Sequence, residues 1–302
     1  MNTPEPDLAA LRQASLQHRL ILDAGPFRVR CRSGERDFLA TLASFYGPGM
    51  HTSVESVVDF EIAVSRPRTL RRWVRPQAIF TIDGLRPFDP QPVSHAFPMY
   101  EWGLNWCIAT SAHRYLMLHA GTVAFAEHAL ILPGNPGSGK STLCAALTLR
   151  GGRLLSDEFG LVRPERLDVM PMPRGIPLKN ASIPAILEFD PGAELGPIYL
   201  NTRKGTVRHL KPGETSLAAQ AIPARPRWLV FPQYRVGATE RLAPLEPAEA
   251  FRRLALNCFN YKLLGETAFR TIADMVRQSA SYAFTFSNLE RASEQLLALA
   301  RS

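Results

Sequence analysis

Alternating hydrophobic and polar residues in the first third of the chain predict short strands, with one segment of helical spacing between them. The expected strands are Arg19–Leu22, Phe27–Arg32, Val57–Val64 and Ala78–Ile82, and the expected helix is Asp37–Phe45. The residues before this pattern form a polar tail. We therefore expect a small α+β module, which contains no cluster of side chains typical of catalysis.

Longer apolar segments follow and alternate between strand and helix patterns. The expected strands are Tyr115–His119, Ala129–Pro133, Arg153–Ser156, Trp228–Phe231 and Ala283–Phe286. The expected helices are Met99–Ala112, Ser141–Arg150, Ala248–Leu264, Thr267–Gln278 and Leu289–Leu299. The strand–loop–helix–strand order predicts an α/β core with a parallel or mixed sheet. Because 86–93 holds three prolines, we expect a boundary there, with domains 1–95 and 96–302.

The composition of the 302 residues is 46% hydrophobic and 21% charged, which excludes collagen-like, coiled-coil and disordered classes. No apolar run reaches the roughly 20 residues that span a bilayer, and the first twenty residues are too polar for a secretory signal. The four cysteines are far apart and form no CxxC pair. We therefore expect reduced, mostly buried thiols, no zinc site and a cytoplasmic protein.

The net charge of +8 comes largely from arginine, since only five of the 35 basic residues are lysine. The densest basic patch consists of Arg66, Arg68, Arg71, Arg72 and Arg75. Positive charge suits acidic or phosphate-bearing partners. We favour a solvated edge over a nucleic-acid interface, because Trp73 is the only aromatic residue among these arginines and no recognition motif is present.

One motif carries specific chemistry. The residues Gly134-Asn135-Pro136-Gly137-Ser138-Gly139-Lys140-Ser141 satisfy GxxxxGK[ST] and are followed by Thr142. Glycines let the backbone curl so that its N–H groups point at phosphate oxygens, lysine reaches the β- and γ-phosphates, and the serine hydroxyl can bind Mg²⁺. An apolar strand before the motif and a helix after it provide the context such a loop needs. The sequence therefore predicts nucleotide binding.

Two adjacent carboxylates follow the next strand. Asp157 lies 17 residues beyond Lys140, and Glu158 comes directly after it. At a strand end near the phosphate loop, one carboxylate can take a proton from an attacking hydroxyl while the other holds Mg²⁺. The alternative is a turn or helix start that uses Asp157 as a cap.

Three further residues are candidates for the same site. His119 lies at the end of an expected strand, where it would orient a carboxylate or serve a structural role. Arg174 and Lys179 lie in a segment rich in proline and glycine, where they would neutralise a transferred phosphoryl group or face solvent.

These residues, taken in order, resemble the catalytic core of the HPr kinase/phosphorylase family. The matching stretches are His119-Ala120-Gly121, the loop at 134–142, and Arg150-Gly151-Gly152-Arg153-Leu154-Leu155-Ser156-Asp157-Glu158. The family has a His-x-Gly before its phosphate loop, then an Arg-Gly-x-Arg-Leu turn and two acidic residues. The loop at 173–179 and the stretch at 229–232 are more similar to the HPr-kinase-related serine kinases. The resemblance spans about residues 110–300.

This resemblance implies a P-loop domain of the HPr kinase/PEP carboxykinase type and a role for each matching residue. Residues 134–142 would bind the phosphates of ATP, and Ser141 and Glu158 would hold Mg²⁺. Asp157 would take the proton from a serine hydroxyl, with support from His119. Arg174 would match an arginine of a later signature loop.

Two departures from the family narrow the expected activity. Glu158 stands where the family has Asp, and Met172 stands where the founding enzymes have a metal-binding Glu. We therefore expect an ATP- and Mg²⁺-dependent kinase acting on a serine of a protein or peptide, rather than a phosphorylase acting on HPr. The alternatives are an ATP-binding adaptor without phosphotransfer and a small-molecule kinase. Neither a membrane nor a nucleic acid is expected as a partner, and the family resemblance suggests a homo-oligomer.

Overall fold

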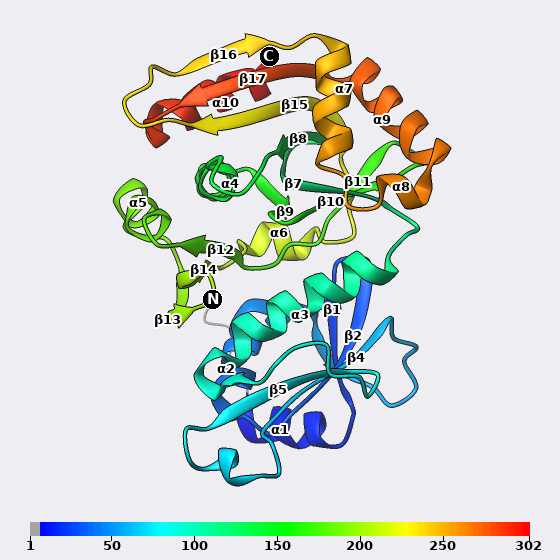
Figure 1. Ribbon diagram of the computed structural model, residues 1–302, viewed down its shortest axis with the longest axis vertical. Coiled ribbons are helices and arrows are strands. Elements are labelled where there is room, and N and C mark those ends of the chain that lie inside the picture. Colours follow the sequence, from blue (N-terminus) through cyan, green and yellow to red (C-terminus); the bar gives the residue numbers. More distant parts are fainter. Residues whose placement is uncertain (1–6) are drawn as a thin grey trace. The chain divides into compact units, whose positions relative to one another are not determined.

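The computed structural model describes residues 7–302, which divide into two compact units. Unit 1 comprises the chain up to Thr110 together with Gly196–Thr206, and unit 2 comprises Ser111–Leu195 and Val207–Ser302. Both units combine helices with β-sheets, so the α/β class expected from the sequence is confirmed (Figure 1). No helix in the described part of the chain is long and apolar enough to cross a membrane.

Unit 1 is built on a sheet with strand order β3-β1-β2-β4-β5-β6. Its strands are β1 (Leu20–Ala24), β2 (Phe27–Ser33), β3 (Met50–Thr52), β4 (Phe60–Ser65), β5 (Gln77–Ile82) and β6 (Gln91–Pro92). Its helices are α1 (Leu8–Leu16), α2 (Arg36–Tyr46) and α3 (Ala96–Ser111). Strands β2 and β4 are parallel, and the other described pairs are antiparallel. The alternating patterns that predicted β1, β2, β4 and β5 are confirmed.

The boundary between the units differs from the one expected after residue 95. Helix α3, which the sequence analysis assigned to the second region, packs on the sheet of unit 1. A Cβ added to Gly103 would lie 2.1 Å from the Phe80 ring, so the absence of a side chain lets the helix approach β5. Phe97 contacts Phe45, with ring centroids 4.8 Å apart. The apolar helix therefore completes the core of the first unit.

Unit 2 contains a mixed sheet with strand order β11-β10-β7-β8-β15-β17-β16, and β9 also pairs with β7. Its strands are β7 (Leu116–Phe125), β8 (His128–Pro133), β9 (Arg153–Ser156), β10 (Phe159–Arg163), β11 (Asp168–Met170), β15 (Arg225–Tyr234), β16 (Arg241–Pro244) and β17 (Ala280–Phe286). A separate sheet has the order β12-β14-β13, from β12 (Ile176–Lys179), β13 (Leu195–Thr202) and β14 (Gly205–Leu210); its residues 196–206 are counted with unit 1. Strands β8, β15 and β17 run parallel to one another, and β7 is antiparallel to β8, β9 and β10.

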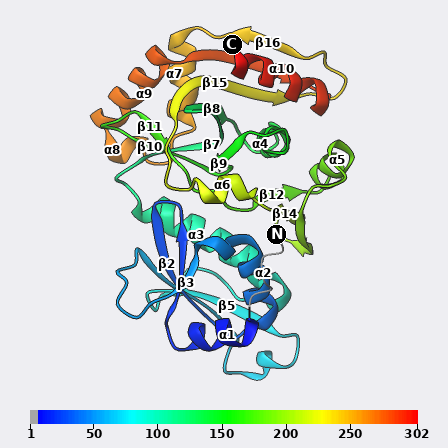
Figure 2. The ribbon, with the colours of Figure 1, turned by 180° about the vertical axis from the view of Figure 1, so that it is seen from behind.

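Helices cover both faces of the main sheet of unit 2 (Figures 1 and 2). They are α4 (Lys140–Leu149), α5 (Ser182–Phe189), α6 (Glu214–Ala218), α7 (Pro247–Leu256), α8 (Tyr261–Leu264), α9 (Glu266–Gln278) and α10 (Leu289–Arg301). One buried cluster joins the sheet to α4, α5 and α10, and a second joins it to α7 and α9. The result is a layered α/β/α arrangement with a core on each side of the sheet.

Two expected elements of unit 2 differ from the structure. The helix expected over 248–264 is interrupted between α7 and α8. There the backbone pairs with β7: the N–H of His119 donates to the Asn257 carbonyl at 2.7 Å, and the N–H of Phe259 donates to the Met117 carbonyl at 2.9 Å. The strand expected to end at His119 instead continues to Phe125. The backbone hydrogen bonds with β7 therefore decide the structure at 257–259, against the helical propensity of the sequence.

The polar start of the chain also differs from the expected tail, as far as the structure describes it. Helix α1 forms over Leu8–Leu16, and the Asp7 side chain accepts hydrogen bonds from the Ala9 and Ala10 N–H groups. Asp7 thereby satisfies two of the backbone donors left open at a helix start. Residues 1–6 of the expected tail lie outside the described residues.

Candidate functional site

The glycine-rich loop joins β8 to α4, as the sequence predicts, and its backbone is tightly curled. Gly137 and Gly139 adopt left-handed conformations, with φ of +85° and +84°. A Cβ added to Gly134 would lie 2.5 Å from the Ser138 hydroxyl. The N–H of Tyr234 donates to the Ser138 carbonyl at 3.0 Å, which ties the loop to the end of β15. The loop therefore depends on glycine where the motif requires it.

Helix α4 begins at Lys140, directly after the loop, with Gly139 as its N-cap. The first N–H groups of a helix have no partner within the helix, and the helix dipole makes this end positive. Lys140 is only 7% exposed, and burial, as the largest effect, lowers the pKa of its ammonium group, while Asp157 and Glu158 act in the opposite direction. Backbone donors, helix dipole and ammonium group together form an anion site.

Strands β9 and β10 both pair with β7, one after the other, and Asp157 and Glu158 lie in the break between them. Ser156 pairs with Thr122 and Phe159 pairs with His119, both antiparallel. The same register sets Asp157 opposite Gly121. The pair therefore lies between β9 and β10, and the helix start considered as the alternative for Asp157 does not occur.

Gly121 explains how α4 comes close to these carboxylates. A Cβ there would lie 3.2 Å from the Cys144 Cβ and 3.4 Å from the Lys140 Cγ. Side chains at facing positions of an antiparallel pair share one face of the sheet. Asp157 therefore shares the face that α4 covers, next to Lys140 and Cys144.

The Asp157 carboxyl group is buried and has an unusual charge balance. It is 5% exposed, and neither of its oxygens accepts a hydrogen bond within the described residues that meets ordinary geometry. Burial raises the pKa of Asp157 from 3.8 to about 6, against the opposing effect of Lys140, while Glu158 adds to the rise. The Ser141 hydroxyl acts in the opposite sense, towards a lower pKa. A buried carboxylate that lacks partners is costly unless a ligand supplies them.

Lys179 belongs to the same charged group, although it is distant in sequence. Its charge lowers the pKa of both Asp157 and Lys140, as a smaller effect than burial. The segment that carries it forms strand β12, whose Ile176 and Leu178 join the buried cluster on α4. The solvent-facing loop considered for Lys179 is therefore replaced by a strand beside the candidate site.

Arg174 is also buried, at 7% exposure, so the solvent-facing alternative is wrong for this residue as well. The segment leading to it passes beside β9, because the N–H of Met172 donates to the Leu155 carbonyl at 2.6 Å. Met172 itself is 1% exposed. The sequence resemblance aligned this position with a metal-binding Glu, and in the structure Met172 is a core residue.

His119 lies within β7, and not at its end as the sequence suggested. Alternation along the strand puts it on the same face as Gly121, diagonal to Asp157, a relation that corresponds to about 7–8 Å between Cα atoms. Its ring lies 5.3 Å from that of Phe259. Its backbone carbonyl accepts from the Gly134 N–H at 3.4 Å. A role for His119 towards Asp157 stays a prediction.

A cavity of about 630 Å³ lies beside the loop, at the carboxyl ends of β8, β15 and β17. Residues 133–138, 231–234 and 283–285 line it, together with Arg252, Arg253, Leu256 and Asn257 of the α7 region. The volume is in the range of small-molecule sites, and the ends of parallel strands are where α/β sheets bind ligands. The sequence analysis did not identify the residues of the α7 region that line this cavity, since α7 carries no motif.

The oxygen donors near the loop fit a magnesium nucleotide. No group of three or more histidine, cysteine or acidic residues suited to a metal ion occurs among residues 7–302. Mg²⁺ bound to a nucleotide needs only one or two protein oxygens, because phosphates and waters fill its other positions. Ser141 and Glu158 supply such donors. Compared with known proteins, the chain matches no family model, and no curated protein is similar to it.

Proposed function

We propose that the protein is an ATP- and Mg²⁺-dependent kinase that transfers the γ-phosphoryl group to a serine hydroxyl of a protein or peptide. The observation that carries this proposal is the buried Asp157 carboxyl group, with a pKa raised to about 6 beside Lys140 and the start of α4. A general base works best when its pKa is near the working pH. The Asp157 oxygens make no hydrogen bond of ordinary geometry with the described residues, although the Ser141 hydroxyl acts to lower its pKa, so they are open to an incoming hydroxyl group.

The proposed step is an in-line displacement. The serine oxygen forms a bond to the γ-phosphorus while the bond from that phosphorus to the β–γ bridging oxygen breaks, and ADP leaves with the electron pair. Asp157 takes the proton of the serine hydroxyl. Lys140 and the N–H groups at the start of α4 stabilise the negative charge on the phosphoryl oxygens.

The remaining residues have supporting roles in this proposal. Ser141 and Glu158 would hold Mg²⁺, which when bound neutralises phosphate charge. Lys179 adds positive charge that acts on Asp157 and Lys140, and Arg174 is proposed to act on the phosphoryl group from the family resemblance. Electrostatic stabilisation is the main contribution to phosphoryl transfer. The cavity beside the loop has room for the nucleoside part of ATP. His119 is proposed as a support for Asp157, from the family resemblance and its position on the same face of β7.

The test is phosphate transfer from γ-labelled ATP in the presence of Mg²⁺, with host lysate as the source of acceptors. The proposal predicts a labelled protein or peptide band that disappears with the Lys140→Ala variant. Lys262→Ala in α8 is the matched control, since Lys262 is exposed and lies in the same unit.

The alternatives give different results in the same assay. ATP binding without any labelled product favours a nucleotide-sensing adaptor. A label that appears only in the small-molecule fraction favours a metabolite kinase. Either result contradicts the serine kinase proposal.

A further inference from the structure

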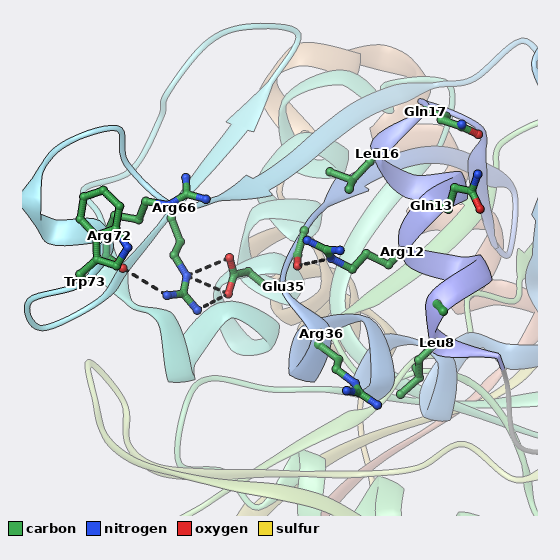
Figure 3. Close-up of a pocket in the computed structure, with 12 residues that line it drawn as sticks. Leu8, Arg12, Gln13, Leu16, Gln17, Glu35, Arg36, Arg66, Arg72 and Trp73 are labelled. Atoms are coloured by element: carbon green, nitrogen blue, oxygen red, sulfur yellow. Dashed lines mark hydrogen bonds and ion pairs between the residues drawn. The ribbon is translucent and has the colours of Figure 1, made fainter.

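Unit 1 contains a hollow of about 930 Å³ that is separate from the candidate active site (Figure 3). Helix α1 forms one side, and the segment around Leu70–Arg72 forms the other, with residues 34–36 between them. Figure 3 shows Leu16 and Arg12 of α1 facing Trp73 and Arg72 across Glu35 and Arg66. We call this hollow the arginine groove.

Apolar side chains are exposed in and beside the arginine groove. Leu16 is 48% exposed and Trp73 is 69% exposed, and both line the hollow. Leu70 and Val74, which flank the arginine-tryptophan pair in sequence, are 76% and 62% exposed. Large apolar residues gathered at one concave site, rather than scattered singly, mark a surface that binds a partner.

The charge of the groove is strongly positive. Arg12, Arg36, Arg66 and Arg72 line it, and Glu35 is the one acidic residue among the described residues that line it. Glu35 is already paired, because the Arg66 guanidinium donates to its carboxylate at 2.8, 2.9 and 3.0 Å.

The other arginines keep their charge available. Arg12 donates to the Gly34 carbonyl at 3.0 Å, and the Arg72 guanidinium lies over the Trp73 ring at 5.9 Å from its centre. Arg36 and Arg72 have no acidic partner among the described residues, and both are exposed. Arg68, Arg71 and Arg75 are close in sequence to Arg66 and Arg72 and are also exposed. A partner that brings carboxylates would complete these groups.

We propose that the arginine groove binds an acidic peptide segment that carries an apolar side chain for the Leu16–Trp73 surface. Carboxylates of the peptide pair with Arg36 and Arg72, and the apolar side chain packs on the indole ring. The assignment of this peptide as part of the phosphorylated acceptor rests on the proposed kinase function, whereas the binding itself rests on the groove alone. The substrate class then becomes an acidic protein or peptide.

A peptide fits the groove better than a nucleic acid does. Single-stranded nucleic acids use several aromatic platforms along a continuous basic track, whereas Trp73 is the only aromatic residue among the described residues that line this hollow. Mixed apolar and guanidinium surfaces are typical of protein-recognition sites.

The test measures binding by fluorescence anisotropy with three labelled probes of about twelve units. The first is a peptide of Asp and Glu with interspersed Leu and Phe, the second has Lys at every acidic position, and the third is oligouridylate. The proposal predicts that only the acidic peptide binds well and that its affinity falls as salt rises. The Arg36→Glu/Arg72→Glu variant should weaken binding about tenfold or more.

Matched variants separate charge from folding. Arg166→Glu/Arg241→Glu makes the same change of net charge at exposed positions of unit 2, and we expect it to alter binding by less than about twofold. Trp73→Ala removes the apolar contact without changing charge and should weaken binding by about three- to tenfold. If the acidic peptide binds no better than the basic one, or if oligouridylate binds more tightly, the proposal is wrong.

The two proposals can fail separately. Peptide binding is measured without ATP and on Lys140→Ala as well as on the unaltered protein, and we expect equal affinity for both. Peptide binding without any phosphate transfer would leave the groove intact and reject the kinase. Phosphate transfer to a lysate protein without binding of the acidic peptide would do the reverse.

Discussion

In unit 2, Lys140, Asp157 and Arg174 are each less than a tenth exposed, whereas most arginines of the arginine groove in unit 1 are open to solvent. The buried carboxylate of unit 1, Glu101, accepts a hydrogen bond from the Tyr46 hydroxyl at 2.7 Å. Asp157 has no such donor among the described residues. The charged residues of the candidate site in unit 2 are therefore buried, whereas most charged residues of the arginine groove in unit 1 are exposed.

The contrast indicates which region performs chemistry and which recognises a partner. A buried carboxylate whose hydrogen bonds are incomplete costs stability, and such a cost persists where a ligand offsets it during function. Exposed charge costs little, and it mainly guides association and selects partners. Unit 2 has the first arrangement and unit 1 has the second.

The largest effect is expected for Lys140→Ala in unit 2. Removal of the ammonium group should weaken ATP binding and lower phosphate transfer by about 10²-fold or more, because a charge in a water-poor site acts strongly on phosphates. Calorimetric titration with ATP and Mg²⁺ measures the binding. Unchanged affinity for ATP would mean that the loop does not bind phosphates in the expected way.

The pH dependence of stability should differ between the protein and Asp157→Asn. The pKa of Asp157 is about 6 in the folded state and 3.8 as its ordinary value. The folded state therefore holds this proton more tightly, and the stability it contributes is present below about pH 4 and is lost as the pH rises through about 6. Relative to Asp157→Asn, the protein should lose about 2 kcal/mol between pH 4 and pH 7.5.

Urea denaturation at both pH values checks this difference. Asp274→Asn provides the control, since Asp274 lies on α9 and is partly exposed. A difference between the protein and Asp157→Asn that stays constant with pH would show that Asp157 is not a buried, unpaired carboxylate.

Two glycines of the loop should respond differently to alanine, although their φ values are nearly equal. A Cβ on Gly139 would lie 2.6 Å from the Phe286 ring, whereas nothing lies within 4 Å of one on Gly137. Gly137→Ala should cost about 1–2 kcal/mol for the left-handed backbone, and Gly139→Ala about 1–3 kcal/mol more for the overlap. Thermal unfolding of both variants tests the order, and equal costs would contradict the packing of Phe286 on the loop.

The smallest effect is expected in unit 1. Arg36 is exposed and has no acidic partner among the described residues, so Arg36→Glu should change stability by no more than about 0.5 kcal/mol. Its affinity for ATP should equal that of the unaltered protein. A marked loss of ATP binding in this variant would contradict the assignment of nucleotide binding to unit 2 and partner binding to unit 1.

The sequence predicts the loop, the helix after it and the strand before Asp157, because each has a strong local signal. The glycine spacing identifies residues 134–141, and the apolar run over 129–132 identifies β8. Local sequence patterns do not predict the burial of Asp157. It depends on Gly121, which is distant in sequence and admits α4 to the face of β7.

Other features depend on contacts that no local pattern encodes. The interruption between α7 and α8 arises because Asn260 bridges β7, with its amide donating to the Tyr115 carbonyl at 2.7 Å and its side-chain oxygen accepting from the Met117 N–H at 3.0 Å. The assignment of 196–206 to unit 1 likewise has no signal in composition. Long-range pairing decided these elements against local propensity.

The most direct test of the central claim is Asp157→Asn, with ATP binding and phosphate transfer measured on the same sample. The substitution keeps the shape of the side chain and removes its ability to take a proton. We predict an ATP affinity within about threefold of the unaltered protein and a loss of transfer of about 10³-fold. Normal transfer, or a parallel loss of ATP binding and transfer, would contradict the role of Asp157 as the base.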